Sequence, residues 1–125
     1  MRRALPLALP LLLLLAGCSS ETNMDTLQDA LMAHGACDGY LEEPDEVVPM
    51  FSSPQEIKQC PSGTHLLITD DPFSDLDRLR IMSEAIGMHK LPVAYGENWI
   101  ILPATEDLEA TRKAAETLNG TSTKL

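Results

Sequence analysis

Motifs that would mark an enzyme are absent from this chain of 125 residues. It contains no GxSxG nucleophile elbow, no SxxK pair and no glycine-rich loop able to cradle a phosphate group. The four aspartates between positions 70 and 77 lack the glycine and terminal glutamate of an EF-hand, so a calcium site there is the weaker interpretation. We therefore expect a protein that is not an enzyme and that binds no cofactor.

Positive charge is also scarce. Nine lysine and arginine residues stand against 19 aspartate and glutamate residues, which gives a formal net charge of −10. Nucleic acid and anionic lipid headgroups repel a protein of this charge, so neither is an expected partner. Solubility is the simplest reason for the acidity, and an acidic docking surface is the alternative.

An apolar segment long enough to cross a bilayer as a helix is missing as well. The best candidate, residues 4–15, falls short of the roughly 20 apolar residues that a span needs, and Pro6 and Pro10 interrupt it. Because Arg2 and Arg3 precede it, the segment is typical of a secretory signal peptide. The sequence thus predicts export rather than a spanning anchor.

A short motif follows this segment at once. Leu15, Ala16, Gly17 and Cys18 resemble the lipobox of bacterial lipoproteins. The resemblance implies that signal peptidase II removes residues 1–17 by cutting between Gly17 and Cys18, and that the Cys18 thiol carries a diacylglycerol. Two or more acyl chains anchor a protein stably, whereas a single chain anchors it only marginally. The alternative is an ordinary secreted protein whose signal peptide happens to end in cysteine.

Removal of the signal peptide would change both the charge and the location of the chain. Seven basic and 19 acidic residues would remain on 108 residues, a net charge of −12. Residues 18–23 would form a lipidated polar tether that lifts the domain by no more than roughly 20 Å, at about 3.3 to 3.6 Å per extended residue. We expect a protein on the extracytoplasmic side of the cell membrane. In a Gram-negative cell, Ser19 after the cysteine would suit the outer membrane.

Two cysteines are left once Cys18 carries lipid. Cys37 and Cys60 lie in an exported chain, where disulfides persist, and neither belongs to a CxxC motif. We expect them to form a disulfide that stabilises the fold by roughly 3 kcal/mol in the chain-entropy model. A free redox pair or a zinc site is the alternative.

Helical periodicity marks three segments of the mature chain. Helices are predicted between Asn23 and Gly35, between Ser74 and Gly87, and from Thr105 to Gly120, each with one apolar side. Compact apolar runs predict strands at 66–69, 91–95 and 99–102, the last two joined by a turn at 96–98, and residues 46–50 are a candidate for a further strand.

This order of elements predicts an α+β fold. We expect a single domain over residues 24–120, a small ferredoxin-like (split β-α-β) two-layer sandwich with helices on one face of the sheet. An additional N-terminal helix and a disulfide-stapled loop would complete the domain. Residues 121–125 would form a flexible tail.

The loop between the two cysteines is the first candidate contact surface. Residues 38–59 contain three prolines, show no periodicity and carry an acidic cluster, which consists of Glu42, Glu43, Asp45 and Glu46. Long irregular loops often carry function. We therefore consider this cluster a candidate contact for a protein partner.

Histidines and aromatic residues supply weaker candidates. His65 and His89 each precede a predicted strand, and they are weak candidates for a metal site because spacing places no third ligand. Trp99 is the only tryptophan. With Tyr95 across the predicted turn it forms an aromatic pair that is either a core anchor or a binding platform.

The turn around Trp99 also resembles known proteins. Residues 96–101, together with the entry to the first predicted strand at 60–63, resemble small exported proteins and lipoproteins of actinobacteria over about residues 58–102. That group has no established activity. The resemblance therefore supports the domain boundaries rather than a function.

Three functions agree with these features. The first is a membrane-anchored lipoprotein that acts as a non-catalytic protein-interaction module at the cell envelope. The second is a small-ligand or metal-binding lipoprotein, and the third is a phage- or prophage-encoded surface lipoprotein that blocks superinfection. The sequence predicts a membrane anchor but no reactive group, which favours the protein-interaction module.

Overall fold

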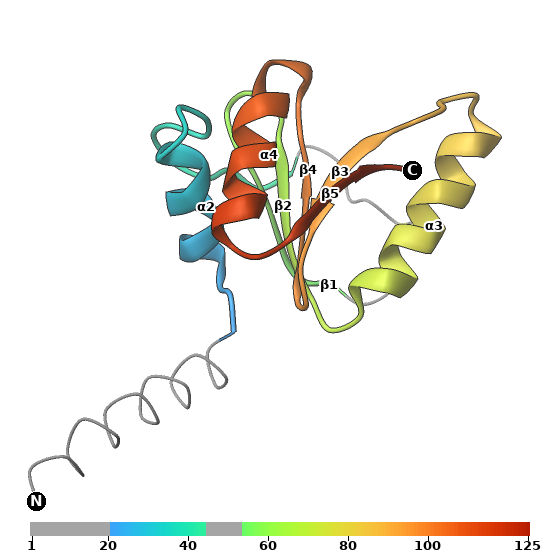
Figure 1. The fold of residues 1–125 in the computed structure, drawn as a ribbon, viewed down its shortest axis with the longest axis horizontal. Coiled ribbons are helices and arrows are strands. Elements are labelled where there is room, and N and C mark those ends of the chain that lie inside the picture. The colour runs from blue at the N-terminus through green and yellow to red at the C-terminus, as the bar shows by residue number, and fades with distance from the viewer. Residues whose placement is uncertain (1–20, 45–53) are drawn as a thin grey trace, which may run out of the picture.

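Five antiparallel strands form one sheet in the computed structural model, which describes residues 21–44 and 54–125 (Figure 1). They are β1 (Pro54–Gln59), β2 (His65–Thr69), β3 (Pro92–Tyr95), β4 (Trp99–Leu102) and β5 (Thr121–Lys124), in the spatial order β1-β2-β4-β3-β5. The strands predicted at 66–69, 91–95 and 99–102 correspond to β2, β3 and β4. The predicted signal peptide, Cys18 and the candidate strand at 46–50 lie outside the described residues.

Side-chain caps fix where the first two helices begin. α2 (Met24–Met32) begins after Asn23, as predicted, and the Asn23 side chain accepts a hydrogen bond from the backbone N–H of Thr26 at 2.9 Å. α3 (Pro72–Ala85) begins earlier than predicted, because Asp71 rather than Ser74 is its cap and proline suits the first helical turn. α4 (Leu108–Thr117) follows a 3-10 turn, η1 (Thr105–Asp107).

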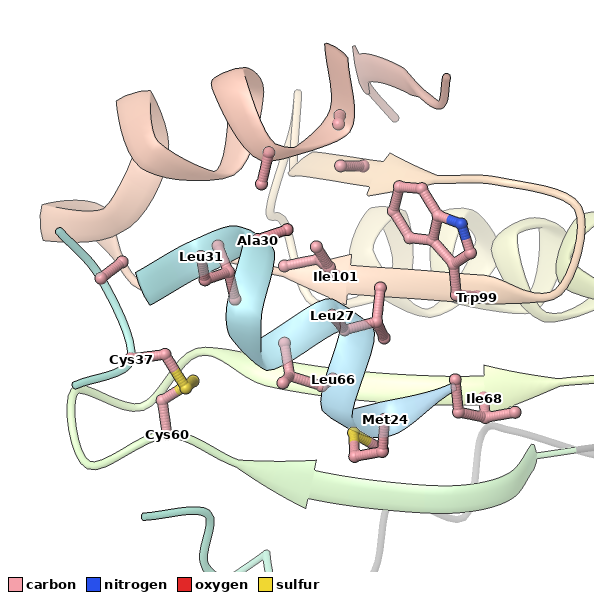
Figure 2. Close-up of a cluster of buried hydrophobic side chains, with 14 residues drawn as sticks. Met24, Leu27, Ala30, Leu31, Cys37, Cys60, Leu66, Ile68, Trp99 and Ile101 are labelled. Atoms are coloured by element: carbon pink, nitrogen blue, oxygen red, sulfur yellow. A yellow bond between two sulfur atoms is a disulfide. The ribbon is translucent and has the colours of Figure 1, made fainter. Parts of the chain in front are cut away.

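Helices cover both faces of the sheet (Figure 1). On one face, α2 and α4 pack against the strands through Leu27, Leu31, Leu66, Ala94, Ile101 and Ala114 (Figure 2). On the other face, α3 packs through Leu67, Leu76, Leu79, Val93 and Ile100. Leu66 and Leu67 are neighbours in β2 yet join different clusters, because successive residues of a strand point to opposite faces.

The α+β class is confirmed, whereas the two-layer ferredoxin-like sandwich is not. β2 and β3 are parallel to each other, lie on either side of β4, and are connected by α3. In the same way, β4 and β5 are parallel to each other, lie on either side of β3, and are connected by α4. Both connections cross one strand in the same direction along the sheet, but their first strands, β2 and β4, are antiparallel to each other. Right-handed crossovers therefore place α3 and α4 on opposite faces, which gives three layers.

The two edge strands, β1 and β5, lie in segments that were predicted to be irregular or flexible. β5 occupies residues 121–124, which were expected to form a flexible tail, and it pairs with β3 in the register Val93↔Thr123. β1 occupies part of the loop that was expected to be irregular, and it pairs with β2. β1 thereby fills the free edge of β2, the position that the last strand of a ferredoxin-like sheet would take.

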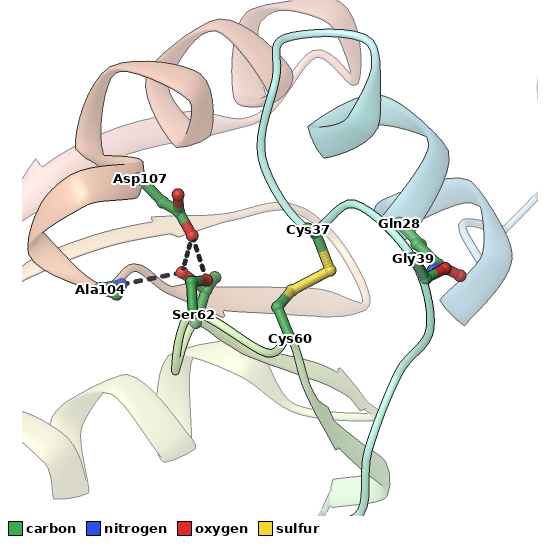
Figure 3. Close-up of a disulfide and its surroundings, with 8 residues drawn as sticks. Gln28, Cys37, Gly39, Cys60, Ser62, Ala104 and Asp107 are labelled. Carbon is green, nitrogen blue, oxygen red and sulfur yellow. Dashed lines mark hydrogen bonds between the residues drawn. A yellow bond between two sulfur atoms is a disulfide. The ribbon is translucent and has the colours of Figure 1, made fainter.

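The predicted disulfide is confirmed. Cys37 and Cys60 are bonded, both are buried, and their Cα atoms lie 5.0 Å apart (Figure 3). The bond joins the segment after α2 to the end of β1, next to a pair of backbone hydrogen bonds between Glu42 and Gln59 at 2.8 Å. It therefore connects the outer helix layer to the edge of the sheet.

Candidate functional site

The acidic cluster lies partly outside the described residues. Asp45 and Glu46 are not described, and Glu42 is held by its backbone against Gln59. The exposed carboxylate of Glu43 pairs with the ammonium of Lys58. This hydrogen bond raises the pKa of Lys58 above its usual range, although burial opposes the shift. Part of the acidic charge expected for partner contact is therefore neutralised within the chain.

The two weak metal candidates, His65 and His89, differ in exposure. His65 begins β2 and is half-buried, whereas His89 is exposed in the turn after α3. Within residues 21–44 and 54–125, no three histidine, cysteine, aspartate or glutamate side chains are grouped so that they could hold a metal ion. The geometry of the described residues thus lends no support to a site at this pair.

The aspartates around the start of α3 have structural contacts. Asp71 caps the helix, Asp77 pairs with Arg80 at 2.6 Å, and Asp75 is fully buried. The Asp75 carboxylate accepts a hydrogen bond from the Thr69 hydroxyl at 2.6 Å. The contacts of Asp71 and Asp75 stabilise the junction between β2 and α3.

A second buried carboxylate joins two turns of the fold (Figure 3). Asp107 accepts hydrogen bonds from the hydroxyls of Ser62 at 2.5 Å and Thr64 at 2.6 Å. The Thr64 hydroxyl in turn accepts from the backbone N–H of Ala104 at 2.9 Å. Asp107 thus fixes the turn after Cys60 to the start of α4. The sequence placed Asp107 in the first helical turn but gave no signal of these partners.

Trp99 is a core residue, one of the two interpretations offered for it. It is 1 % exposed and lies on the face covered by α2 and α4, whereas Tyr95 belongs to the α3 side. The expected pair of Tyr95 and Trp99 does not form, because the two residues point to opposite faces of the hairpin. Tyr95 instead contacts Phe73 edge to face, with ring centroids 5.7 Å apart.

Two glycines make room for the indole ring. A Cβ atom on Gly96 would lie 2.2 Å from the indole Nε1, and one on Gly120 would lie 2.5 Å from Cη2. Neither glycine has a positive φ, so both positions require glycine for space rather than for backbone freedom. The ring therefore lies against the β3–β4 turn and the end of α4 at once (Figure 2).

A cavity of about 400 Å³ lies beside this ring, at one end of the sheet. It is bounded by the segment before α2, the β3–β4 turn and the turn after α4, and its lining includes Glu21, Thr22, Glu97, Asn98, Trp99 and Asn119. The Asn98 side chain donates to the backbone carbonyl of Thr22 at 2.7 Å. This bond fixes the end of the predicted tether to the rim of the cavity.

No family model, curated protein or solved structure matches this chain. No helix among residues 21–44 and 54–125 has the length and apolar content that crossing a membrane requires. Evidence for function therefore comes from the surface and cavities of the described residues.

The end of α3 carries an exposed apolar surface that the sequence did not predict. Four large apolar residues lie there, between 41 and 67 % exposed; we call them the α3 tip: Ile81, Met82, Ile86 and Met88. They make up half of the eight exposed large apolar side chains that the described residues contain. α3 was expected to have a single apolar side, but its second half leans away from the sheet (Figure 1). Apolar residues there remain in contact with solvent.

Proposed function

We propose that this protein is an exported lipoprotein, anchored by lipid on Cys18, that binds another protein of the cell envelope through the α3 tip and catalyses no reaction. The observation that carries the proposal is the concentration of exposed methionine and isoleucine at one end of one helix. Exposed apolar patches commonly mark interaction sites. Flexible methionine side chains adapt well to a partner surface.

The position of the anchor supports a protein as the partner rather than lipid. Thr22 is held by Asn98, so only three residues separate the fixed chain from Cys18, and these four residue-to-residue steps reach about 14 Å when extended. In Figure 1, the first described residues lie at the lower left and the end of α3 at the upper right. An anchor at Cys18 thus leaves the α3 tip facing away from the membrane.

Charge around the α3 tip supports the same proposal. The exposed residues Arg78, His89 and Lys90 lie next to it, and Arg78 and Lys90 form no ion pair with any other described residue. The mature chain as a whole carries −12. The α3 tip is therefore suited to a partner surface with an apolar centre and acidic residues around it, because basic side chains would face acidic ones.

Crosslinking in the native host tests this contact directly. A photoreactive amino acid replaces Ile86 at the α3 tip, and the matched control carries it at Lys113, an exposed position on α4. We expect one discrete crosslinked protein from position 86 and none from position 113. Equal products from both positions, or none from position 86, would contradict the proposal.

Two sets of substitutions then separate the α3 tip from the acidic cluster. Ile86→Asp with Met88→Asp should abolish the crosslink when the photoreactive residue is moved to position 82, and should leave thermal unfolding unchanged because both side chains are exposed. Glu42→Gln with Glu43→Gln should leave the crosslink in place. Loss of the crosslink in the second set alone would instead assign the contact to the acidic cluster.

A further inference from the structure

We infer that a cavity between α4 and the edge strand β5 binds a small carboxylic acid with a branched or aromatic apolar body. This cavity has a volume of about 270 Å³ and is separate from the one beside Trp99. The inference is independent of the α3 tip. It gives the small-ligand function considered from the sequence a site away from His65 and His89, neither of which lines this cavity.

A buried hydroxyl without a partner carries the inference. Thr111 lines the cavity and is 2 % exposed. Within residues 21–44 and 54–125, its hydroxyl is the one buried side-chain polar atom that makes no hydrogen bond. Threonine in a helix commonly donates to a backbone carbonyl one turn earlier, as Thr117 of the same helix does to Lys113 at 3.1 Å. Buried polar groups normally have a partner, so the Thr111 hydroxyl predicts a ligand oxygen in the cavity.

The register of β5 places a positive charge on the same face of the sheet. Residues directly opposite each other in antiparallel strands lie on one side of the sheet, and β5 pairs with β3 as Pro92↔Lys124 and Ala94↔Ser122. Ala94 belongs to the cluster under α2 and α4, so the alternation of the strand puts Lys124 on the side of α4. Lys124 also lines the cavity.

The charges around the cavity favour an anionic ligand. Glu109 and Arg112 both line it, and they neutralise each other, because Arg112 Nε donates to the Glu109 carboxylate at 3.2 Å. Lys124 forms no ion pair with another described residue. A carboxylate suits this combination, since one of its oxygens can accept from the Thr111 hydroxyl and the other from the Lys124 ammonium.

The rest of the lining determines the body of the ligand. Pro92, Pro103 and Leu108 line the cavity, and Leu108 is 41 % exposed. An apolar ligand body would cover these side chains and remove them from water. The cavity lies just below the range of drug-sized sites, about 300 to 1,000 Å³, so a short branched chain or a single ring fits it better than a long acyl chain.

Titration with matched small molecules tests the inference. The full chain is purified from membranes in detergent, and the backbone amide signals of β5 are followed by NMR while 4-methylpentanoate or benzoate is added. We expect a saturable shift of these signals. Acetate lacks the apolar body and 4-methylpentylamine has the opposite charge, so both should bind at least about tenfold more weakly. No saturable shift with either apolar acid, or equal binding of acetate or of the amine, would overturn the inference.

The substitution Thr111→Val separates a ligand contact from a structural role. Valine has a similar shape but no hydroxyl, so the variant should bind the better acid about tenfold more weakly. Because the hydroxyl has no partner in the fold, its removal should leave the melting temperature of the ligand-free protein unchanged or raise it. A lower melting temperature would assign the hydroxyl to the fold, and unchanged binding would show that no ligand oxygen contacts it. Either result contradicts the inference.

The substitution Lys124→Met tests the role of charge. It removes the ammonium from an exposed side chain, so we expect about tenfold weaker binding of the better acid. Lys113→Met, at an exposed lysine of α4 outside the cavity, is the matched control and should bind as the wild type does. Equal binding by the two variants would overturn the proposed contact. The crosslink at Ile86 uses a different surface, so failure here and failure of the proposed protein contact are distinguishable.

Discussion

Reduction of the Cys37–Cys60 disulfide should lower the thermal stability of the domain strongly. The bond closes a loop with a sequence separation of 23 residues, and both cysteines are buried. In the chain-entropy model, a loop of this length makes the disulfide worth about 3.4 kcal/mol at 25 °C. A domain of this size changes its melting temperature by about 4 to 8 °C per kcal/mol, so the expected loss is about 14 to 27 °C.

Circular dichroism during heating measures this loss in the full chain, with and without dithiothreitol. The double variant Cys37→Ala, Cys60→Ala is the control, because it lacks the bond under both conditions. We expect the reductant to lower the melting temperature of the wild type and to leave that of the variant unchanged. A decrease of less than about 5 °C in the reduced wild type would refute the loop-closure reasoning. A reductant effect of equal size in the variant would refute it as well.

Three further predictions concern buried and charged contacts. Gly120→Ala should destabilise the fold by about 1 to 3 kcal/mol in urea unfolding, because its Cβ would overlap the Trp99 ring, whereas the exposed Ser122→Ala should change stability by less than about 0.5 kcal/mol. Asp107→Ala should cost about 1 to 3 kcal/mol in the same assay by leaving two hydroxyls without their acceptor. The hydrogen bond from Arg112 lowers the pKa of Glu109, so NMR titration should find its carboxylate ionised to lower pH than usual, and Arg112→Gln should raise that pKa.

Local signals in the sequence predicted the elements that depend on neighbouring residues. The Asn23 cap and the spacing of Leu27 and Leu31 determine α2 within one short segment. β2 and β4 are compact apolar runs because both of their faces are covered by helices. Such features are readable from a single sequence, since the partners lie a few residues apart or the burial is uniform.

Elements that depend on distant pairing were not predictable in this way. β5 consists of four exposed polar residues without an apolar pattern, and it pairs with β3 through its backbone. The distribution of helices over two faces follows from strand order, which no local pattern specifies. The setting of Trp99 likewise requires Gly96 and Gly120 to meet across the fold, and in the sequence these glycines signalled only a turn and a helix end.

The candidate sites also differ in how far the sequence predicted them. Cys37 and Cys60 could be paired from their number and the export signal alone. The α3 tip escaped prediction because Met82 and Ile86 continue the helical spacing of Leu76 and Leu79, which normally indicates a buried side. In the structure the second half of α3 leans away from the sheet (Figure 1), and these side chains are exposed.

Mass spectrometry of the protein extracted from membranes tests the central claim most directly, namely that lipid on Cys18 holds this domain at the membrane. We predict that the N-terminal peptide of the mature protein begins at Cys18 and carries two or three acyl chains. We also predict that Cys18→Ser abolishes labelling with a fatty-acid precursor. A mature N-terminus at another residue, an unmodified Cys18 thiol, or labelling that survives Cys18→Ser would contradict the account.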